Sequence, residues 1–340
     1  MIILGIESSA HTFGVGIVRD EPPHILADVR FVYKPKTGGI HPKEASQYFV
    51  SNAPEAIKEA LSKAGVKVSD LDGIAVALGP GMGPCLRVGA TLARAMASYY
   101  GKPLIPVNHA LAHIEIGKML FSFKNPLIVY LSGGNTLIAS FSEGRYRIFG
   151  ETLDISLGNF LDTLARELGI APPYVVSGLH QIDRCAQNGK NFIELPYVVK
   201  GQDVSFSGLL TAALKLYKNS RAELGDICYS AREIAYSAII EVSERALAHT
   251  GNKEVLVVGG VASSPVLRSK FEVMSRLRRV ELGIVPPQYA VDNGVMIAWT
   301  GLLLLKHGVH VRPEEAYVRQ RWKLDQVDVP WLARTNSSGG

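Results

Sequence analysis

The chain contains little cysteine and no long hydrophobic run. Its 340 residues include only three cysteines, Cys85, Cys185 and Cys228, which are far apart and lack C-x-x-C spacing. This usage argues against a disulfide framework and a thiolate zinc site, and it favours a reducing interior. The longest apolar run, residues 295–305, is too short to span a bilayer, and the N-terminus lacks the basic segment of a signal peptide. We therefore predict a soluble, cytoplasmic protein that does not bind a membrane.

Neither sign of charge is in large excess. Lysine and arginine number 36 against 31 acidic residues, which leaves a net charge of +5. That charge is compatible with a polyanionic partner but does not require one, because it can be spread evenly over the surface. Hydrophobic residues make up 47% and charged residues 20% of the chain, which excludes a disordered or collagen-like protein.

Strand patterns and helix patterns alternate along the chain, which predicts an α/β architecture. A strand, a turn of small residues and a second strand open the chain at 2–18, and a similar unit returns at 127–141. The repetition suggests two related halves with a ligand cleft between them, although any two hairpins can look alike. We predict strands at 2–6, 13–18, 73–78, 103–107, 127–131, 137–141 and 254–258. We predict helices at 42–64, 86–100, 110–120 and 293–307, and a further helix that ends at 274.

The length suggests two domains, at about 100–200 residues per domain. We predict a first lobe over residues 1–125 and a second lobe over 126–330. The last predicted helix, 293–307, is expected to pack back on the first lobe. Residues 331–340 are typical of a flexible tail.

Three turns made of small residues follow predicted strands. They are Ser8-Ser9 with Thr12, the segment Ser132-Gly133-Gly134-Asn135-Thr136, and Gly259-Gly260. Glycine lets main-chain amides approach an anion closely, and a turn that opens a helix can face a phosphate. No turn matches the P-loop or the G-x-G-x-x-G motif. Each turn alone can be purely structural, but three at strand ends favour nucleotide binding.

Two histidines, His109 and His113, lie four residues apart on a predicted helix. On one helix face their imidazoles are close enough to bind one ion, while surface or capping histidines are the alternative. Ala110 follows His109, so the H-E-x-x-H motif of metallopeptidases is absent. A carboxylate must complete the site, and Asp292, just before the last predicted helix, is the candidate. Two histidines and one carboxylate suit Fe(II) or Zn(II) acting as a Lewis acid.

The chain resembles a known family at four segments: 109–115, 130–136, 203–213 and 292–294. The family is that of the tRNA N6-adenosine threonylcarbamoyltransferases, formerly called O-sialoglycoprotein endopeptidases. The resemblance extends from about Ile3 to Trp331, and the block from Asp203 is too long to arise by chance. Tyr130 and the Ile-Glu pair after His113 are similar to the archaeal and eukaryotic branch, whose members are the catalytic subunits of the KEOPS complex.

The resemblance implies an actin/Hsp70/sugar-kinase-like fold, in which two duplicated α/β lobes surround a nucleotide cleft. It implies one divalent metal ion per chain, with Fe(2+) favoured and Zn(2+) possible, and ATP, AMP or threonylcarbamoyl-AMP as the nucleotide. The implied metal ligands are His109, His113, Tyr130 and Asp292, and the implied catalytic residues are His109, His113 and Asp292. The implied nucleotide contacts are Ser132, Gly133, Gly134, Asn135, Asp162, Leu179, Asp183, Gly260 and Ser264.

The implied reaction moves the threonylcarbamoyl group from threonylcarbamoyl-AMP to the N6 amine of the adenosine beside the anticodon, in tRNAs that read codons beginning with adenine. AMP is released. The implied partners are tRNA, a small atypical kinase and a small dimerising subunit. For the general base, Asp162 and Glu7 are both conceivable, and residue spacing favours neither.

Other functions remain open from the residues alone. A nucleotide-binding scaffold subunit would use the turns to bind its ligand but would catalyse no reaction. A sugar-kinase-like phosphotransferase would share the fold without needing the two histidines. Basic residues cluster at 34–36, 276–279 and 319–323. They could contact RNA phosphates, or they could lie on an ordinary solvated face.

Two stretches depart from the family's pattern in the predicted nucleotide wall. Leu179 and His180 stand where the family has Gly-Pro, and Ser264 stands where it has Asn. A milder change is Lys43, where the family has Arg. The metal ligands, by contrast, are all present. At Leu179 and His180 the wall therefore loses the close approach of the nucleotide to the backbone. At Ser264 it loses a side-chain amide, which can both donate and accept hydrogen bonds.

We accordingly predict weakened or re-posed nucleotide binding. Calorimetric titration with AMP would measure it, with an ordinary family member as the reference. Equal affinities for the two proteins would contradict the prediction.

Overall fold

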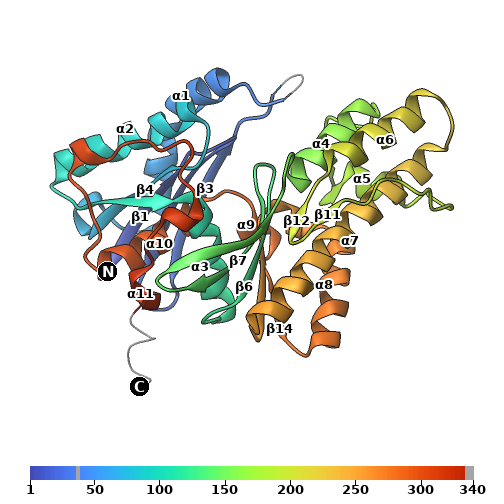
Figure 1. Cartoon of the computed structure of the whole chain (residues 1–340). Helices are drawn as coiled ribbons and strands as arrows, with labels where there is room; N and C mark the ends of the chain where they lie inside the picture. Colours follow the sequence, from blue (N-terminus) through green and yellow to red (C-terminus); the bar gives the residue numbers. More distant parts are fainter. Residues whose placement is uncertain (36–38, 334–340) are drawn as a thin grey trace. The chain divides into compact units, whose positions relative to one another are not determined.

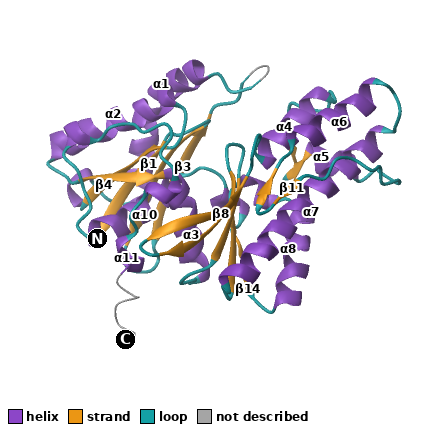
Figure 2. Ribbon diagram, in the orientation of Figure 1, coloured by secondary structure: helices purple, strands orange, loops and turns teal. Residues whose placement is uncertain are grey.

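The structure is a computed structural model that describes residues 1–35 and 39–333. The chain divides into two compact units, each of mixed α/β structure (Figure 2). Unit 1 contains residues 1–119, 143–145 and the chain from 291 onward, and unit 2 contains residues 120–142 and 146–290. Two predictions fall partly outside the described residues, namely Lys36 of the first basic cluster and residues 334–340 of the tail.

Unit 1 is built on a five-stranded sheet of order β3-β2-β1-β4-β5. Strands β1 to β3 are antiparallel neighbours, while β4 pairs parallel with both β1 and β5. The strands are β1 (Ile2–Glu7), β2 (Thr12–Arg19), β3 (Ile25–Val32), β4 (Gly73–Gly79) and β5 (Leu104–Asn108). The helices are α1 (Pro42–Ala64), α2 (Gly83–Tyr100), α3 (His109–Phe121), α10 (Gly294–Lys306) and α11 (Pro330–Ala333), with 3-10 turns η1 (Val68–Asp70), η3 (Pro313–Glu315) and η4 (Leu324–Gln326).

Unit 2 repeats this design. Its five-stranded sheet has the order β14-β13-β6-β7-β8, which is the strand order of the first sheet when equivalent strands are matched along the chain. The strands are β6 (Leu127–Leu131), β7 (Thr136–Ser142), β8 (Arg145–Glu151), β13 (Glu254–Val258) and β14 (Glu281–Ile284). The helices are α4 (Leu157–Glu167), α5 (Gln181–Ala186), α6 (Ser207–Lys218), α7 (Leu224–Thr250), α8 (Pro265–Arg278) and α9 (Pro287–Ala290), with the 3-10 turn η2 (Gly260–Ser263). Two short ribbons pair β9 (Val175–Val176) with β10 (Leu179–His180), and β11 (Val199–Lys200) with β12 (Asp203–Val204).

The predicted α/β fold with two related halves is confirmed by these matching sheets. Helix α1 and strands β6 and β13 have the bounds that the sequence predicts. For α1 the reason is local, because Pro42 occupies its first turn and Gly65 ends it in the left-handed conformation. Helix α2 begins three residues earlier than predicted, at Gly83, since Pro84 is accommodated in its first turn.

One expectation from composition was wrong. Cys185 on α5 and Cys228 on α7 form a disulfide, although their sequence separation of 43 residues gave no pairing signal. Folding brings α5 against α7 and so places the two thiols within bonding distance. Cys85 is a buried free thiol. Among the described residues, no helix has both the length and the apolar character needed to cross a bilayer.

Alternation along β1 divides its side chains between two helical layers. Leu4 and Ile6 belong to a core cluster with Phe49 of α1, whereas Gly5 faces α10 on the opposite side of the sheet (Figure 1). The contact with α10 is unusually close. A Cβ atom on Gly5 would lie 2.2 Å from the Ala298 nitrogen, and one on Gly294 would lie 2.1 Å from the Gly16 nitrogen. Glycine is therefore required for α10 to pack directly on the backbone of β1 and β2.

We predict that Gly294→Ala destabilises the protein. Its methyl group has no space against β2, and overpacking of this kind costs about 1–3 kcal/mol. Thermal unfolding would show a lower midpoint, by about 2–4 °C for each kcal/mol. Gly39→Ala is the control, because a Cβ there meets open space. Equal midpoints for the two variants would contradict this account of the α10 contact.

Candidate metal centre

Helix α3 begins where strand β5 ends, and this junction positions both histidines. The Asn108 side chain accepts a hydrogen bond from the Leu111 amide, which caps the helix, and its Nδ2 donates to the Trp322 carbonyl. His109 is thus the first helical residue, and His113 follows one turn later on the same face. Both rings are buried, with 7% and 2% of the residue exposed.

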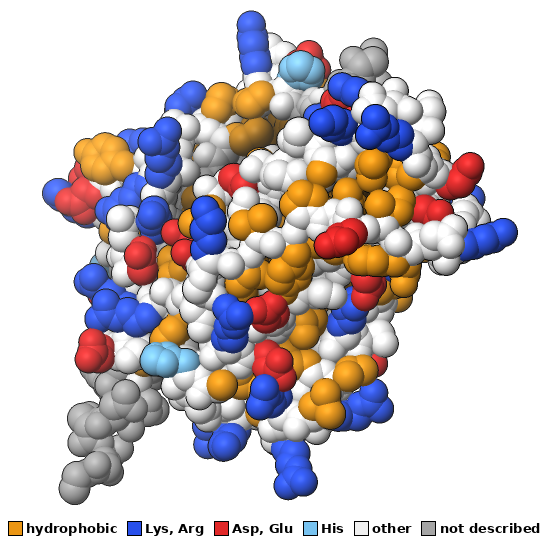
Figure 3. Space-filling model, turned by 45° about the vertical axis from the view of Figure 1, so that its right-hand side comes forward, with side chains coloured by type: hydrophobic (Ala, Val, Ile, Leu, Met, Phe, Trp, Pro, Cys, Tyr) orange, Lys and Arg blue, Asp and Glu red, His pale blue; other side chains and the backbone are white. Residues whose placement is uncertain are grey.

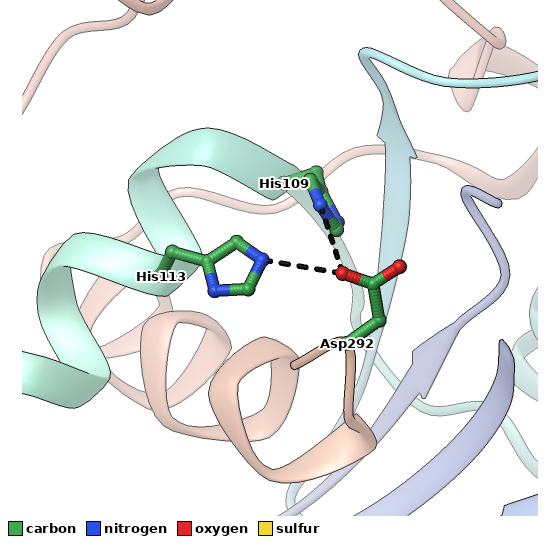
Figure 4. A group of neighbouring side chains, drawn as sticks. All are labelled: His109, His113 and Asp292. Carbon is green, nitrogen blue, oxygen red and sulfur yellow. Dashed lines mark hydrogen bonds and ion pairs between the residues drawn. The ribbon is translucent and has the colours of Figure 1, made fainter. Parts of the chain in front are cut away.

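Asp292 reaches the histidines from the start of α10. Asn293 caps that helix by accepting a hydrogen bond from the Met296 amide, so Asp292 directly precedes the cap. Its Oδ1 lies 3.5 Å from Nε2 of His109 and 3.3 Å from Nε2 of His113 (Figure 4). The three potential ligand atoms all lie within 4.8 Å of one another. The structure therefore brings together, inside unit 1, the three residues that sequence spacing selected.

Glu7, at the end of β1, holds the other side of His109. Its Oε2 is 2.9 Å from Nδ1 of the imidazole, and Ser9 contributes a hydroxyl 3.1 Å from the same nitrogen. The Glu7 side chain is fully buried. A carboxylate behind a histidine fixes the ring's orientation and directs its other nitrogen outward, here toward Asp292. Sequence analysis had noted Glu7 only as a conceivable base, because nothing in the sequence links it to a histidine 102 residues away.

The charges of these groups are strongly coupled. Burial opposes protonation of His109, but the carboxylates of Glu7 and Asp292 outweigh it and raise the pKa of His109 to about 9. Burial lowers the pKa of His113. Burial also works against ionised Asp292, yet the charge of His109 and the hydrogen bond from His113 hold the pKa of Asp292 below its ordinary value. At neutral pH His109 is therefore protonated on both nitrogens, and its positive charge lies between the carboxylates of Glu7 and Asp292.

This donor set fits a divalent metal ion. Two imidazole nitrogens and one carboxylate oxygen converge, and the surrounding negative charge exceeds what one neutral and one protonated histidine balance. Tyr130, the fourth ligand implied by the resemblance, lies at full burial in β6 of unit 2. The three-residue group is contained in unit 1.

The predicted nucleotide residues lie in unit 2, beginning with the turn after β6. The Ser132 hydroxyl accepts hydrogen bonds from the amides of Gly134 and Asn135, which closes the turn. Gly133 and Gly134 are exposed, and a Cβ on either would meet open space. The turn rests on the first residues of α4, because Ser156 donates a hydrogen bond to the Gly133 carbonyl. Its exposed glycine backbone is accessible to an anion.

A second turn lies at the end of the neighbouring parallel strand. β13 pairs with β6, and Gly259 follows it with a φ of 92°. A Cβ on Gly259 would lie 2.3 Å from the Leu131 carbonyl oxygen, so only glycine fits between the two strand ends. Gly260 then opens η2. Two turns at the carboxyl ends of adjacent parallel strands are the usual location of a ligand in an α/β sheet.

Of the remaining predicted contacts, Asp183 and Ser264 belong to a buried polar network. Asp183 on α5 is 1% exposed and accepts a hydrogen bond from Tyr236 of α7, whose hydroxyl also bonds Ser264 at the start of α8. Asp162 on α4 is partly exposed and pairs with His180. Leu179 is half-buried in β10. Sequence analysis did not identify Tyr236 as part of this network, since no local motif marks it.

Two arginines of the basic clusters interact with other side chains of the fold. Arg278 pairs with Glu244, and Arg319 stacks over Trp322 at 4.9 Å. On the face shown in Figure 3, lysine and arginine side chains are interspersed with acidic and apolar ones. This distribution matches the small net charge and does not mark a single basic patch on that face.

Comparison with known proteins places the chain among close relatives. A model of the tRNA N6-adenosine threonylcarbamoyltransferase family matches residues 24–299. A protein of that name from Aeropyrum pernix is 57% identical over 332 residues, covering 97% of this chain and 95% of the relative. One from Sulfurisphaera tokodaii is 56% identical over 338 residues, covering 99% of this chain and all of the relative.

Among solved structures, the fold is similar to that of HypF. The crystal structure of HypF from T. kodakarensis superposes with a TM-score of 0.60 at 16% identity, over 94% of this chain and 49% of HypF. A full-length HypF in a phosphate- and nucleotide-bound form gives a TM-score of 0.59 at 13% identity, over 89% of this chain and 46% of HypF. At these identities the likeness supports the fold alone.

We predict that Asp292→Asn abolishes metal retention while the protein remains folded. Asparagine keeps the size of the side chain but removes the charge that faces both imidazoles. Mass spectrometry of the metal content should find about one iron or zinc ion per chain in the unaltered protein and about a tenth of that or less in the variant. Asp20→Asn is the control, since Asp20 pairs with Lys306 on the surface of the same unit. Equal metal content in all three proteins, or none in the unaltered protein, would contradict the ligand assignment.

Proposed function

Because the chain belongs to the tRNA N6-adenosine threonylcarbamoyltransferase family, we propose that it modifies tRNA by the metal-assisted transfer of a threonylcarbamoyl group. The observation that carries the proposal is the convergence of His109, His113 and Asp292 in one buried site. The similarity extends over nearly the whole chain and nearly the whole of the relatives. It favours this transferase over a sugar-kinase-like phosphotransferase or a scaffold without chemistry.

In the proposed reaction, the donor is threonylcarbamoyl-AMP and the acceptor is the N6 amine of the adenosine beside the anticodon, in tRNAs that read codons beginning with adenine. The bond between the carbamoyl carbon and the phosphate oxygen breaks, and a bond between that carbon and N6 forms. AMP leaves with the electron pair, and N6 loses a proton. The amine is a poor nucleophile because its lone pair is delocalised into the ring, so the carbonyl carbon must become more electrophilic.

His109, His113 and Asp292 would hold the ion. Fe(2+) is the favoured ion and Zn(2+) is the alternative. A bound divalent ion supplies Lewis acidity toward the carbonyl oxygen and neutralises charge on the departing phosphate. Glu7 maintains the orientation of His109 through its Nδ1 atom, so that Nε2 faces Asp292. This support fixes the ligand geometry before substrate arrives.

The nucleotide part of the donor is assigned to unit 2. The exposed amides of Gly133 and Gly134 suit a phosphate, because no Cβ blocks the approach. Gly260 begins η2 at the neighbouring strand end. Carboxylates repel phosphate but accept hydrogen bonds from hydroxyls, so Asp162 suits the ribose. Asp183 is buried and accepts a hydrogen bond from Tyr236, so its role is to stabilise the proposed nucleotide site.

Binding of both substrates in attack geometry supplies the rest of the rate enhancement. The tRNA substrate follows from the family's activity. A small atypical kinase and a small dimerising subunit are the partners proposed from the resemblance to KEOPS catalytic subunits.

We predict that His109→Ala loses transferase activity. The purified protein would be incubated with its partners, tRNA, threonine, bicarbonate, ATP and the enzyme that forms the adenylate, and modified adenosine would be quantified by mass spectrometry. Loss of one electrostatic stabiliser lowers the rate on the order of 100-fold. His310→Ala is the control, because His310 is an exposed histidine of the same unit. Full activity of His109→Ala, or release of a sugar phosphate in place of modified adenosine, would refute the proposal.

A further inference from the structure

The short helix α5 in unit 2 is fixed to its surroundings on two sides. On one side the Cys185–Cys228 disulfide and the hydrogen bond from Tyr236 to Asp183 attach it to α7. On the other side its capping residue, His180, contacts Asp162 of α4. His180 is one of the residues where sequence analysis predicts a departure from the family's pattern, so that pattern does not predict the contact.

Both ring nitrogens of His180 are engaged. Nδ1 lies 3.1 Å from the Ile182 amide, and Nε2 lies 3.0 Å from Oδ1 of Asp162. An amide can only donate, so Nδ1 must be unprotonated and accept. A carboxylate can only accept, so Nε2 must carry the proton. The two bonds together select the neutral Nε2–H form of the ring, because a second proton on Nδ1 would displace the helix cap.

Of the two carboxylate oxygens of Asp162, Oδ1 is the one that forms the hydrogen bond with His180. Its side chain is 43% exposed, while that of His180 is 15% exposed. Within the part of the chain that the structure describes, its Oδ2 has no partner among the hydrogen bonds and ion pairs of the fold. The carboxylate is thus oriented through one oxygen by a half-buried ring, and its side chain is partly exposed.

We propose that His180 is a positioning residue for the nucleotide: it orients Asp162 so that the free carboxylate oxygen accepts a hydrogen bond from a ribose hydroxyl of the adenylate. This inference rests on the proposed function, which assigns the adenylate to unit 2. A carboxylate in this place selects a hydroxyl donor and repels a phosphate. The orientation is rigid because α5 is fixed to α7 by a covalent bond and a buried hydrogen bond.

The experiment separates the two functions of the ring. Asparagine is among the best helix-capping residues, so His180→Asn keeps an acceptor for the Ile182 amide but is too short to bridge to Asp162. Calorimetry would measure the binding of AMP and of 2′,3′-dideoxy-AMP to the unaltered protein, His180→Asn, Asp162→Asn and the double variant. Thermal unfolding of each protein would report on the fold.

We expect His180→Asn to bind AMP about tenfold more weakly, with an unfolding midpoint within about 2 °C of the unaltered protein. Asp162→Asn should lose a similar factor, and the double variant should bind no more weakly than either single variant, because the residues act as one unit. The unaltered protein should prefer AMP over dideoxy-AMP, and His180→Asn should reduce that preference. Nitrogen NMR of labelled histidine should show the neutral Nε2–H form of His180.

The inference fails if AMP binds to the unaltered protein and His180→Asn binds it equally well, or if the losses of the two single variants multiply in the double variant. It also fails if the NMR signals show an Nδ1–H or doubly protonated ring at neutral pH. If the unaltered protein binds no AMP, the nucleotide assignment of the proposed function fails first, and the inference that rests on it is overturned with it.

Discussion

The structure of unit 1 depends on the buried negative charge of Glu7 and Asp292 around two imidazoles. Two carboxylates in a site of this kind require a cation, because an unpaired buried charge costs several kcal/mol. Protonation of His109 supplies one positive charge, and the two carboxylates outweigh burial and raise the pKa of His109 to about 9. Three separate chain segments supply these groups: the end of β1, the start of α3 and the residue before the cap of α10. The site therefore exists only when the sheet, α3 and α10 are all in place, and the contact of Gly294 with Gly16 decides where α10 lies.

The repeated sheet design carries different chemical groups at equivalent places. β1 and β6 occupy the same position in their sheets, and each is followed by a hairpin to the next strand. After β1 the chain places Glu7 and Ser9, which bond His109. After β6 it places Ser132 and two glycines, whose backbone stays exposed. A carboxylate at one strand end favours a cation, and bare amides at the other favour an anion. The same strand order thus carries a carboxylate at one strand end and exposed amides at the other.

The sequence allowed prediction of the features that local rules determine. The bounds of α1 follow from Pro42 and Gly65, and the shared face of His109 and His113 follows from their four-residue spacing. Asp292 was predictable from family resemblance and from its position before a helix. The partners of these residues were not predictable. The contacts of Glu7 with His109 and of Cys185 with Cys228 join residues 102 and 43 positions apart, and such pairs depend on packing that no local pattern encodes. His180 and Asp162 are closer, yet the ribbon of β9 and β10 determines which way His180 faces.

The predicted nucleotide wall illustrates how side chains can stabilise a segment where we expect a backbone feature to be lost. Glycine and proline at a wall position allow close approach and fix a turn without forming any side-chain hydrogen bond. Leu179 and His180 give up that approach, and His180 instead caps α5 and bonds Asp162. Ser264 lacks an amide, yet it caps α8 and bonds Tyr236, which in turn bonds Asp183. His180 thus bonds a carboxylate directly, whereas Ser264 bonds a tyrosine that in turn bonds one. For the nucleotide binding that we propose, these bonds favour a re-posed nucleotide over a lost one, because Asp162 and Asp183 keep fixed orientations.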